Sequence, residues 1–386
     1  MSSGLGTITL RILEHVFNYD IVKVVIRLLE PEMKGALNDF GIRCQNGIIP
    51  GSTRSNQRRP VAMIHTSVCD VLGIDYPVLL AGMGGATNAE LVAAVSESGG
   101  LGILACTWRS TDDAVQEIRR IQSLTDRPFG VNFVLHETTE ETFRACLAER
   151  VPVFSFFRGD PAEAIQRAHA VGAVTIDQIT TVQEAEHAVA LGVDVLIAQG
   201  CEAGGHMGPL PLWSLLPEVI KVAGSRPVLA AGGIVDGQGL AAALCFGAAG
   251  VSMGTRFLAT LECPVRDAHK QAILDSQLGD TIATGLWDIL GGREWPGGIK
   301  VRAFRNQMTA RWAGREDEIL AVLETVRAEL SQAEAVQNSA ILPLLAGVGS
   351  ARIHDVKPAG QIVRDVISEA EQILQRLNRQ IAPQSG

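Results

Sequence analysis

Short apolar runs recur between residues 77 and 257 and alternate with amphipathic segments. Eight runs have the composition of buried strands, at residues 77–82, 101–105, 129–135, 151–157, 173–179, 194–200, 227–233 and 250–257. Between them apolar residues recur at i, i+3 and i+4, as Ala114, Ile118 and Ile121 do within residues 113–124. This is the spacing of one helix face. Buried strands that alternate with amphipathic helices predict parallel βα units.

Eight such units predict an α/β fold, a TIM (β/α)8 barrel over residues 63–257. The alternative is an open doubly wound sheet. We favour the barrel because the pattern does not divide into two halves and no GxGxxG follows the first run. Helical patterns such as 113–124 and 182–191 are the expected crossovers, and Ser110, Thr111 and Asp236 are candidate helix caps.

Three further regions flank the predicted barrel. Residues 258–350 contain helical patterns at 265–278 and 316–335, and predict a helical insertion after strand eight that forms part of the substrate pocket. Residues 351–386 predict a C-terminal helix, near 358–377, that closes the barrel, followed by a tail. Residues 1–62 are interpreted as an N-terminal extension with a helix near 8–30 and a linker at 47–60.

Composition narrows the classes of function. The chain has 386 residues and a net charge of -9, which argues against a nucleic-acid binder because phosphate contacts need a basic face. Seven cysteines without CxxC spacing indicate neither a disulfide framework nor a metal site, and fit the cytoplasm. Charged residues interrupt the apolar stretch at 8–30, so we expect no signal peptide and no membrane partner. A homodimer remains possible.

Glycine and polar residues follow several of the predicted strands. The sixth strand ends in Gln199, and His206 comes shortly after it in a glycine-rich segment. Gly232–Gly233 and Gly254–Thr255 follow strands seven and eight, where barrels commonly bind phosphate through backbone N–H groups. These positions predict a phosphate site beside a histidine.

Five motifs then match a known family in order. They are Gly-Met-Gly-Gly at 82–85, Phe-Gly-Val-Asn at 129–132, Ala-Gln-Gly-Cys-Glu-Ala-Gly-Gly-His at 198–206, Ala-Ala-Gly-Gly-Ile-Val-Asp-Gly at 230–237 and Met-Gly-Thr-Arg-Phe at 253–257. From about residue 64 to 378 the chain resembles the nitronate monooxygenase family, formerly called 2-nitropropane dioxygenases.

The resemblance implies an FMN cofactor and a catalytic histidine, His206. The residues expected to bind FMN are Met83, Asn132, Gln199, Gly204, Gly232, Gly233, Ser252, Met253, Gly254 and Thr255. It further implies that alkyl nitronates are oxidised with O2 to carbonyl compounds and nitrite. His206 would hold a nitronate as a cation or remove the α-proton of a neutral nitroalkane as a base.

Other functions stay open beside this one. FMN-dependent NAD(P)H:quinone reductases and enoyl-acyl-carrier-protein reductases share the architecture and the histidine motif, and a non-enzymatic barrel that binds a phosphate ligand is a more distant alternative.

Several other side chains near these motifs have open roles. Glu202 could orient His206 or be solvated, and His136 could face the barrel mouth or solvent. Cys201 is expected to be a small packing residue, whereas Trp287 and Trp295 could replace the pocket tyrosines of some family members. The remaining set, Arg302, Arg305 and Asn306, is expected to anchor the insertion.

Overall fold

The computed structural model describes residues 64–295 and 299–381. The predicted N-terminal helix and linker lie outside the described residues, so they remain predictions. Within the described chain, eight parallel strands form one sheet in the order β1-β9-β8-β6-β5-β4-β3-β2. They are β1 (Val78–Leu80), β2 (Gly102–Ala105), β3 (Phe129–Val134), β4 (Val153–Phe157), β5 (Val174–Ile179), β6 (Val195–Gln199), β8 (Val228–Ala231) and β9 (Gly250–Met253).

The sheet closes on itself between β1 and β2. Leu79 and Leu101 form a parallel bridge, and the Leu80 amide donates to the Leu101 carbonyl over 2.9 Å. Closure confirms the TIM barrel and excludes the open sheet. All eight predicted strands are present, each a little shorter than its apolar run.

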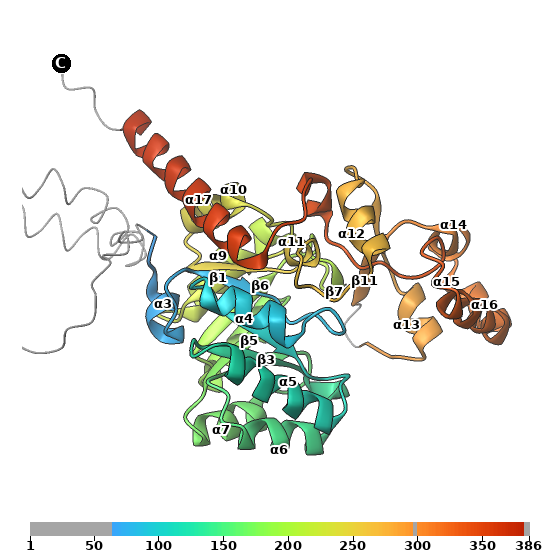
Figure 1. Ribbon diagram of the computed structural model, residues 1–386, viewed down its shortest axis with the longest axis horizontal. Helices are drawn as coiled ribbons and strands as arrows, with labels where there is room; N and C mark the ends of the chain where they lie inside the picture. The colour runs from blue at the N-terminus through green and yellow to red at the C-terminus, as the bar shows by residue number, and fades with distance from the viewer. Residues whose placement is uncertain (1–63, 296–298, 382–386) are drawn as a thin grey trace, which may run out of the picture.

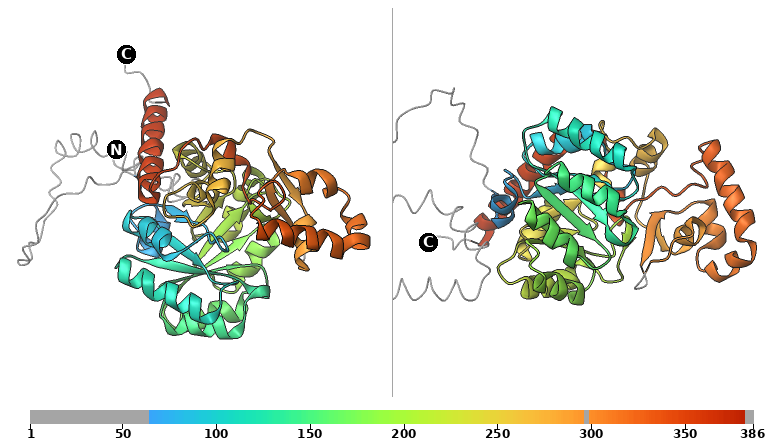
Figure 2. Two further views of the ribbon diagram at one scale, coloured as in Figure 1. Left: turned by 45° about the vertical axis from the view of Figure 1, so that its right-hand side comes forward. Right: turned by 90° about the horizontal axis from the view of Figure 1, so that it is seen from below.

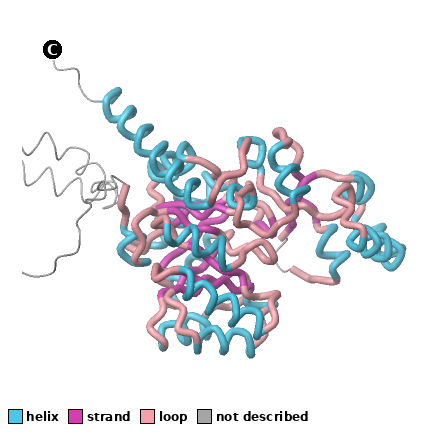
Figure 3. The backbone as a smooth tube through the Cα atoms, in the orientation of Figure 1, coloured by secondary structure: helices cyan, strands magenta, loops and turns pink. Residues whose placement is uncertain are grey.

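Helices surround this barrel in Figures 1 and 3. Those that follow strands are α4 (Ala89–Glu97), α5 (Thr111–Leu124), α6 (Glu140–Ala148), α7 (Ala162–Ala170), α8 (Val182–Ala190), α9 (Leu212–Ala223), α10 (Gly237–Cys245) and α17 (Ala359–Ile381). Ser110 and Asp236 cap α5 and α10, as predicted, by accepting from the amides of Asp113 and Gly239. Thr111 is instead the first residue of α5.

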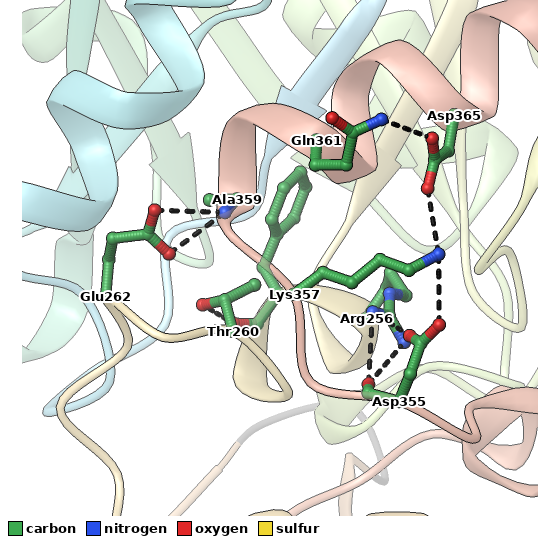
Figure 4. A network of polar contacts seen from close by, with 9 residues as sticks. Arg256, Thr260, Glu262, Asp355, Lys357, Ala359, Gln361 and Asp365 are labelled. Atoms are coloured by element: carbon green, nitrogen blue, oxygen red, sulfur yellow. Dashed lines mark hydrogen bonds and ion pairs between the residues drawn. The ribbon is translucent and has the colours of Figure 1, made fainter.

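The last helix, α17, closes the outer ring against α10 and α4. Figure 4 shows how polar contacts fix its start: both oxygens of Glu262 accept from the Ala359 amide, and Lys357 bridges Asp355 and Asp365. Arg256 donates to Asp355 as well. The barrel-closing helix expected near 358–377 is therefore present, and it extends to Ile381.

The core has two layers. Side chains that point into the barrel, among them Leu79, Ile103 and Ile197, form one cluster with α3 (Ser67–Leu72), which closes the amino-terminal end. A larger cluster fills the space between strands and helices. Such packing on both faces explains why the strands read as continuous apolar runs.

The insertion after β9 lies to one side of the barrel (Figure 2). Its helices are α11 (Thr255–Leu258), α12 (Asp267–Leu274), α13 (Leu286–Gly291), α14 (Gln307–Trp312), α15 (Glu316–Ile319) and α16 (Leu323–Ala335), with the 3-10 turns η3 (Leu320–Val322) and η4 (Val348–Arg352). The predicted helical patterns appear as α12 and as α15 to α16.

A small sheet, which the sequence did not predict, joins the insertion to the barrel. The strands β10 (Thr281–Thr284) and β11 (Lys300–Phe304) are antiparallel, and β11 pairs with β7 (Gly205–Met207), just after β6. Val301 lies opposite His206 in this register. The histidine motif is thus an edge strand of the insertion's own sheet. Among the described residues, no helix is long and apolar enough to cross a membrane.

Candidate functional site

A cavity of about 930 Å³ lies at the carboxyl ends of the barrel strands and is lined by all the strand-end motifs. Its walls include Ala81 to Ala86 after β1, Ala105 after β2, Asn132, Gln178, Gln199, Ala203 to His206, Ala231 to Val235, Ser252, Gly254 and Thr255, with Trp295 from the insertion and Gly347 and Gly349 near η4. This is the face on which TIM-barrel enzymes carry their active sites.

One part of the wall is backbone rather than side chain. Gly232 and Gly233 have φ angles of 112° and 71°, in the region that favours glycine. A Cβ at Gly204 would lie 2.6 Å from the backbone of Ala346 and of Gly347, so this close approach requires glycine. The Gly347 amide in turn donates to Thr255 Oγ1 over 2.9 Å. These glycine segments line the cavity side by side and are called the cradle below; backbone N–H groups of such glycine segments suit a phosphate.

Amide and hydroxyl side chains occupy the adjoining wall. Gln199 donates from Nε2 to the His206 carbonyl over 3.1 Å, while its Oε1 is buried without a partner in the described structure. The same holds for Ser252 Oγ. Asn132 is buried and also lines the cavity. Buried polar atoms normally have hydrogen-bond partners, so free acceptors on this wall fit a ligand with N–H donors, such as the ring system of a flavin.

His206 is held from two sides. Its Nε2 lies 2.8 Å from Asp288 Oδ1, and both side chains are almost buried. The indole of Trp295 stacks on the imidazole with 3.5 Å between ring centroids and 16° between planes. Asp288 belongs to α13 and Trp295 follows that helix, so the insertion supplies both contacts. Trp295 and Arg293 of the insertion also line the cavity.

Two further histidines lie near the cavity. His136 packs edge-on against Trp295, 4.7 Å between centroids, and does not itself line the cavity. Burial lowers the pKa of His136, and the nearby His206 and Arg158 lower it further. His269 lines the cavity and bonds the Leu345 carbonyl, and burial lowers its pKa too. Both lowered values favour neutral imidazoles.

Nearly all the predicted site residues meet at this cavity. His206, Met83, Asn132, Gln199, Gly204, Gly232, Gly233, Ser252, Gly254 and Thr255 all line it. Met253 differs, because its side chain is buried in the core between strands and helices. Met253 does not line the cavity.

Glu202 contacts the start of α9 and not His206. Both of its carboxylate oxygens accept from the Leu212 amide at the start of α9, at 3.1 and 3.0 Å. Glu202 is thus neither solvated nor the residue that orients His206. Asp288 fills that position, 82 residues away in sequence, and no spacing in the chain signals it.

The remaining candidates act mainly as structural supports. Arg302 donates to the Cys201 carbonyl and Asn306 caps α14, while Arg305 donates to the Gly279 carbonyl, which confirms the predicted anchors. Burial raises the pKa of the Cys201 thiol, which suits a packing residue.

The two tryptophans have separate places. Trp295 lines the cavity, whereas Trp287 is buried in the core of the insertion.

The outer mouth of the cavity carries an aromatic ring and a cation. Trp108 is 44% exposed, and the guanidinium carbon of Arg293 lies 5.3 Å from the centroid of its ring. Both residues line the cavity. Within residues 64–295 and 299–381, Arg293 has no ion pair with a carboxylate, whereas the neighbouring Arg109 is paired with Asp113. The mouth thus presents a free positive charge.

Comparison with known proteins identifies the family of this chain. The nitronate monooxygenase profile matches residues 65–149 and 139–369, which is more than half of the chain. The chain belongs to the nitronate monooxygenase family. A probable nitronate monooxygenase of Staphylococcus aureus strain MSSA476 is 30% identical over 354 residues, covering 79% of this chain and 97% of that protein.

Family members are not all described by one activity. A 5-hydroxy-7a-methyl-1-oxo-octahydro-1H-indene-4-carboxyl-CoA dehydrogenase of the 3aS,4S,5R,7aS configuration, from Mycobacterium tuberculosis, is 42% identical over 57% of this chain. The match spans 63% of that dehydrogenase. The structure of FabK from Thermotoga maritima superposes with a TM-score of 0.74 at 32% identity, covering 82% of this chain and all of FabK. The family and fold are shared, whereas the reaction has to be argued from the site.

Proposed function

We propose that this chain is an FMN-dependent nitronate monooxygenase that oxidises alkyl nitronates with O2 to carbonyl compounds and nitrite. The observation that carries the proposal is His206, fixed by Asp288 and Trp295 in the wall of the cavity that the glycine segments also line. Membership of the family supports the same conclusion.

The residues present fit FMN. Gly232, Gly233 and Gly204 would hold its phosphate through backbone N–H groups, with the segment at Gly347 packed behind Gly204. Gln199 and Ser252, whose buried oxygens lack partners in the described structure, would bond the ring system. FMN supplies electron transfer between substrate and O2 when bound. The protein supplies binding, orientation and charge.

His206 would face the substrate's nitro or nitronate group. A nitronate is already an anion, and a protonated imidazole would hold it and fix its carbon next to the flavin site. A neutral nitroalkane would first have to lose its α-proton, for which the neutral imidazole would be the base. Overall, two nitronates and one O2 give two carbonyl compounds and two nitrite ions, which balances atoms and charge.

Donor tests under anaerobic conditions decide the proposal. Purified protein should be yellow with bound FMN, and ethyl nitronate should bleach the flavin absorbance, whereas NADH should not. In air, nitrite should form at two per O2 consumed. Bleaching by NADH without any response to nitronate would rule out the monooxygenase, and a colourless protein that cannot be reconstituted would rule out any flavin enzyme.

A second candidate is oxidation or reduction of an acyl thioester with a nicotinamide partner. The exposed Trp108 ring and the unpaired Arg293 at the cavity mouth favour it, because together they fit the base and phosphates of a nucleotide-bearing tail. The 42% identical relative is a carboxyl-CoA dehydrogenase. Arg293→Ala should raise the KM for a CoA thioester tenfold or more if this candidate is correct. It should leave turnover of ethyl nitronate unchanged.

A further inference from the structure

We propose that Asp288 is the positioning residue for His206: it fixes the proton of the imidazole on Nε2 and leaves Nδ1 as the atom that meets the substrate. The inference rests on the proposed function only in placing the substrate at His206.

The small sheet brings the two residues together. His206 lies on β7, which pairs with β11; β11 pairs with β10, and α13 with Asp288 begins two residues after β10. Thr284 at the end of β10 accepts from the Leu286 amide through Oγ1 and so fixes the first turn of α13. The 2.8 Å contact thus follows from the register of the sheet.

Hydrogen-bond chemistry then determines the tautomer. An ionised carboxylate only accepts, so the contact with Asp288 Oδ1 requires the proton on Nε2. Nδ1 makes no hydrogen bond to any of the described residues. In the neutral ring Nδ1 carries a lone pair and can act as a base, and in the charged ring it is an N–H donor to an anionic oxygen. Trp295 covers the ring face at 3.5 Å and restricts rotation, so the two nitrogens do not exchange places.

Asp288 also places a carboxylate beside the imidazole in a buried setting. The side chain is 10% exposed, and its Oδ2 is buried without a partner in the described structure. A buried carboxylate with one free oxygen needs a nearby cation, and His206 is the group in contact with it. The face of Trp295 also attracts a cation. His136, whose pKa is lowered by burial, lies on the other side of Trp295. These contacts favour anionic substrates.

Histidine NMR tests the tautomer without any assay of activity. In the FMN-loaded protein labelled with 15N at histidine, the His206 signals are identified by their loss in His206→Gln. We expect the neutral form of wild type to carry its proton on Nε2, and Asp288→Ala to give a mixture of both tautomers. A wild-type ring protonated on Nδ1, or unchanged tautomers in Asp288→Ala, would overturn the inference.

Kinetics of the same protein give the second readout. Asp288→Asn, which is almost isosteric, should lower kcat for ethyl nitronate roughly 10–100-fold, the range seen when an orienting partner is lost. It should also move the alkaline fall of the pH profile to lower pH, because the imidazolium has lost its counter-charge. Flavin content and circular dichroism should not change.

Glu329→Gln provides a matched control. Glu329 is a carboxylate of the same insertion and is paired with Arg311 away from the cavity. Its removal should leave the His206 tautomer, kcat and the pH profile unchanged. If wild type does not turn over nitronates, the proposed function fails while the NMR result still tests Asp288. If wild type is active and Asp288→Asn matches it in rate and pH profile, the inference fails alone.

Discussion

Two buried aspartates show how surroundings decide what a side chain does. Asp288 contacts His206 in the cavity wall, whereas Asp177 on β5 faces the layer between the strands and the helices. Burial raises the pKa of Asp177 well above its ordinary value; the charge of Glu184 raises it further, and Arg158 offsets part of the rise. Asp177 makes no hydrogen bond through its carboxylate to the described residues. One carboxylate thus serves the site, while the other weakens the fold when ionised.

His206→Ala should retain FMN but lose activity unequally. Turnover of a neutral nitroalkane should fall about 100-fold or more, since general base catalysis is worth roughly that much. Loss with preformed nitronate should be smaller, because no proton has to be removed. Steady-state rates with nitroethane and with ethyl nitronate measure both. Equal losses would show that the histidine does not act mainly as a base.

Asp177→Asn should stabilise the protein at neutral and alkaline pH. The pKa of Asp177 is higher in the folded protein than the unfolded value of about 3.9. The protonated carboxyl therefore contributes its full stabilisation of the fold only when the pH is below the unfolded value. This stabilisation is lost as the pH rises through the folded-state pKa. The variant should gain about 1–3 kcal/mol at pH 8, the cost of a buried polar group without a partner, and nothing at pH 4. Denaturant unfolding at both pH values measures the difference.

Asp194→Asn is the matched control for that experiment. Asp194 accepts hydrogen bonds from the amide and hydroxyl of Thr175 and also contacts His169. Its replacement should therefore destabilise the protein at pH 8. A loss of stability in Asp177→Asn as well would contradict the account given for Asp177.

At the scale of elements, the phosphate cradle depends on two segments far apart in sequence. The loop after β6 and the segment from Ala346 to Gly349 pack backbone against backbone, joined by the hydrogen bond from the Val348 amide to the Glu202 carbonyl at 3.0 Å. The same loop continues into β7 and so into the sheet that carries α13. One loop thus links the glycine cradle to the part of the cavity that His206 lines.

Gly204→Ala should separate these two segments. The added Cβ would lie 2.6 Å from backbone atoms of Ala346 and Gly347, which cannot rotate away. We expect a loss of about 1–3 kcal/mol in stability, typical of overpacking, and weaker retention of FMN. Thermal unfolding and flavin content after gel filtration measure both. Gly285→Ala, with no atom within 4 Å of the new Cβ, should change neither; full flavin content in Gly204→Ala would contradict the cradle.

At the scale of the whole molecule, the barrel and the insertion each supply residues to the cavity. The barrel provides Gly204, Gly232, Gly233 and the amide groups, while the insertion provides Gly347 beside these glycines together with Asp288, Trp295 and Arg293. The insertion has a hydrophobic core of its own, which includes Leu286, Met308 and Ile319. Substitutions at Asp288, Trp295 or Arg293 are therefore expected to alter substrate choice, whereas substitutions at Gly347 would also disturb the proposed phosphate cradle.

Removal of residues 1–62 should leave activity intact. Every residue placed at the site lies between Ala81 and Gly349, and the first described element, α3, closes the barrel from Ser67 onward. A chain that starts at Met63 should bind FMN and turn over nitronate at the full-length rate, as measured by flavin content and nitrite release. An inactive but folded product would assign residues 1–62 a role in the site.

The sequence by itself determined the barrel, because buried strands and amphipathic helices leave periodic patterns over short stretches. The resemblance to the family named eleven site residues, and ten of them line one cavity; they meet there because the carboxyl ends of parallel strands converge. Only the tertiary structure decided what surrounds His206. Asp288 and Trp295 reach it through a three-stranded sheet whose strands are only three to five residues long. Such short strands of mixed polarity leave no periodic signal, and contacts across 82 residues depend on their register alone.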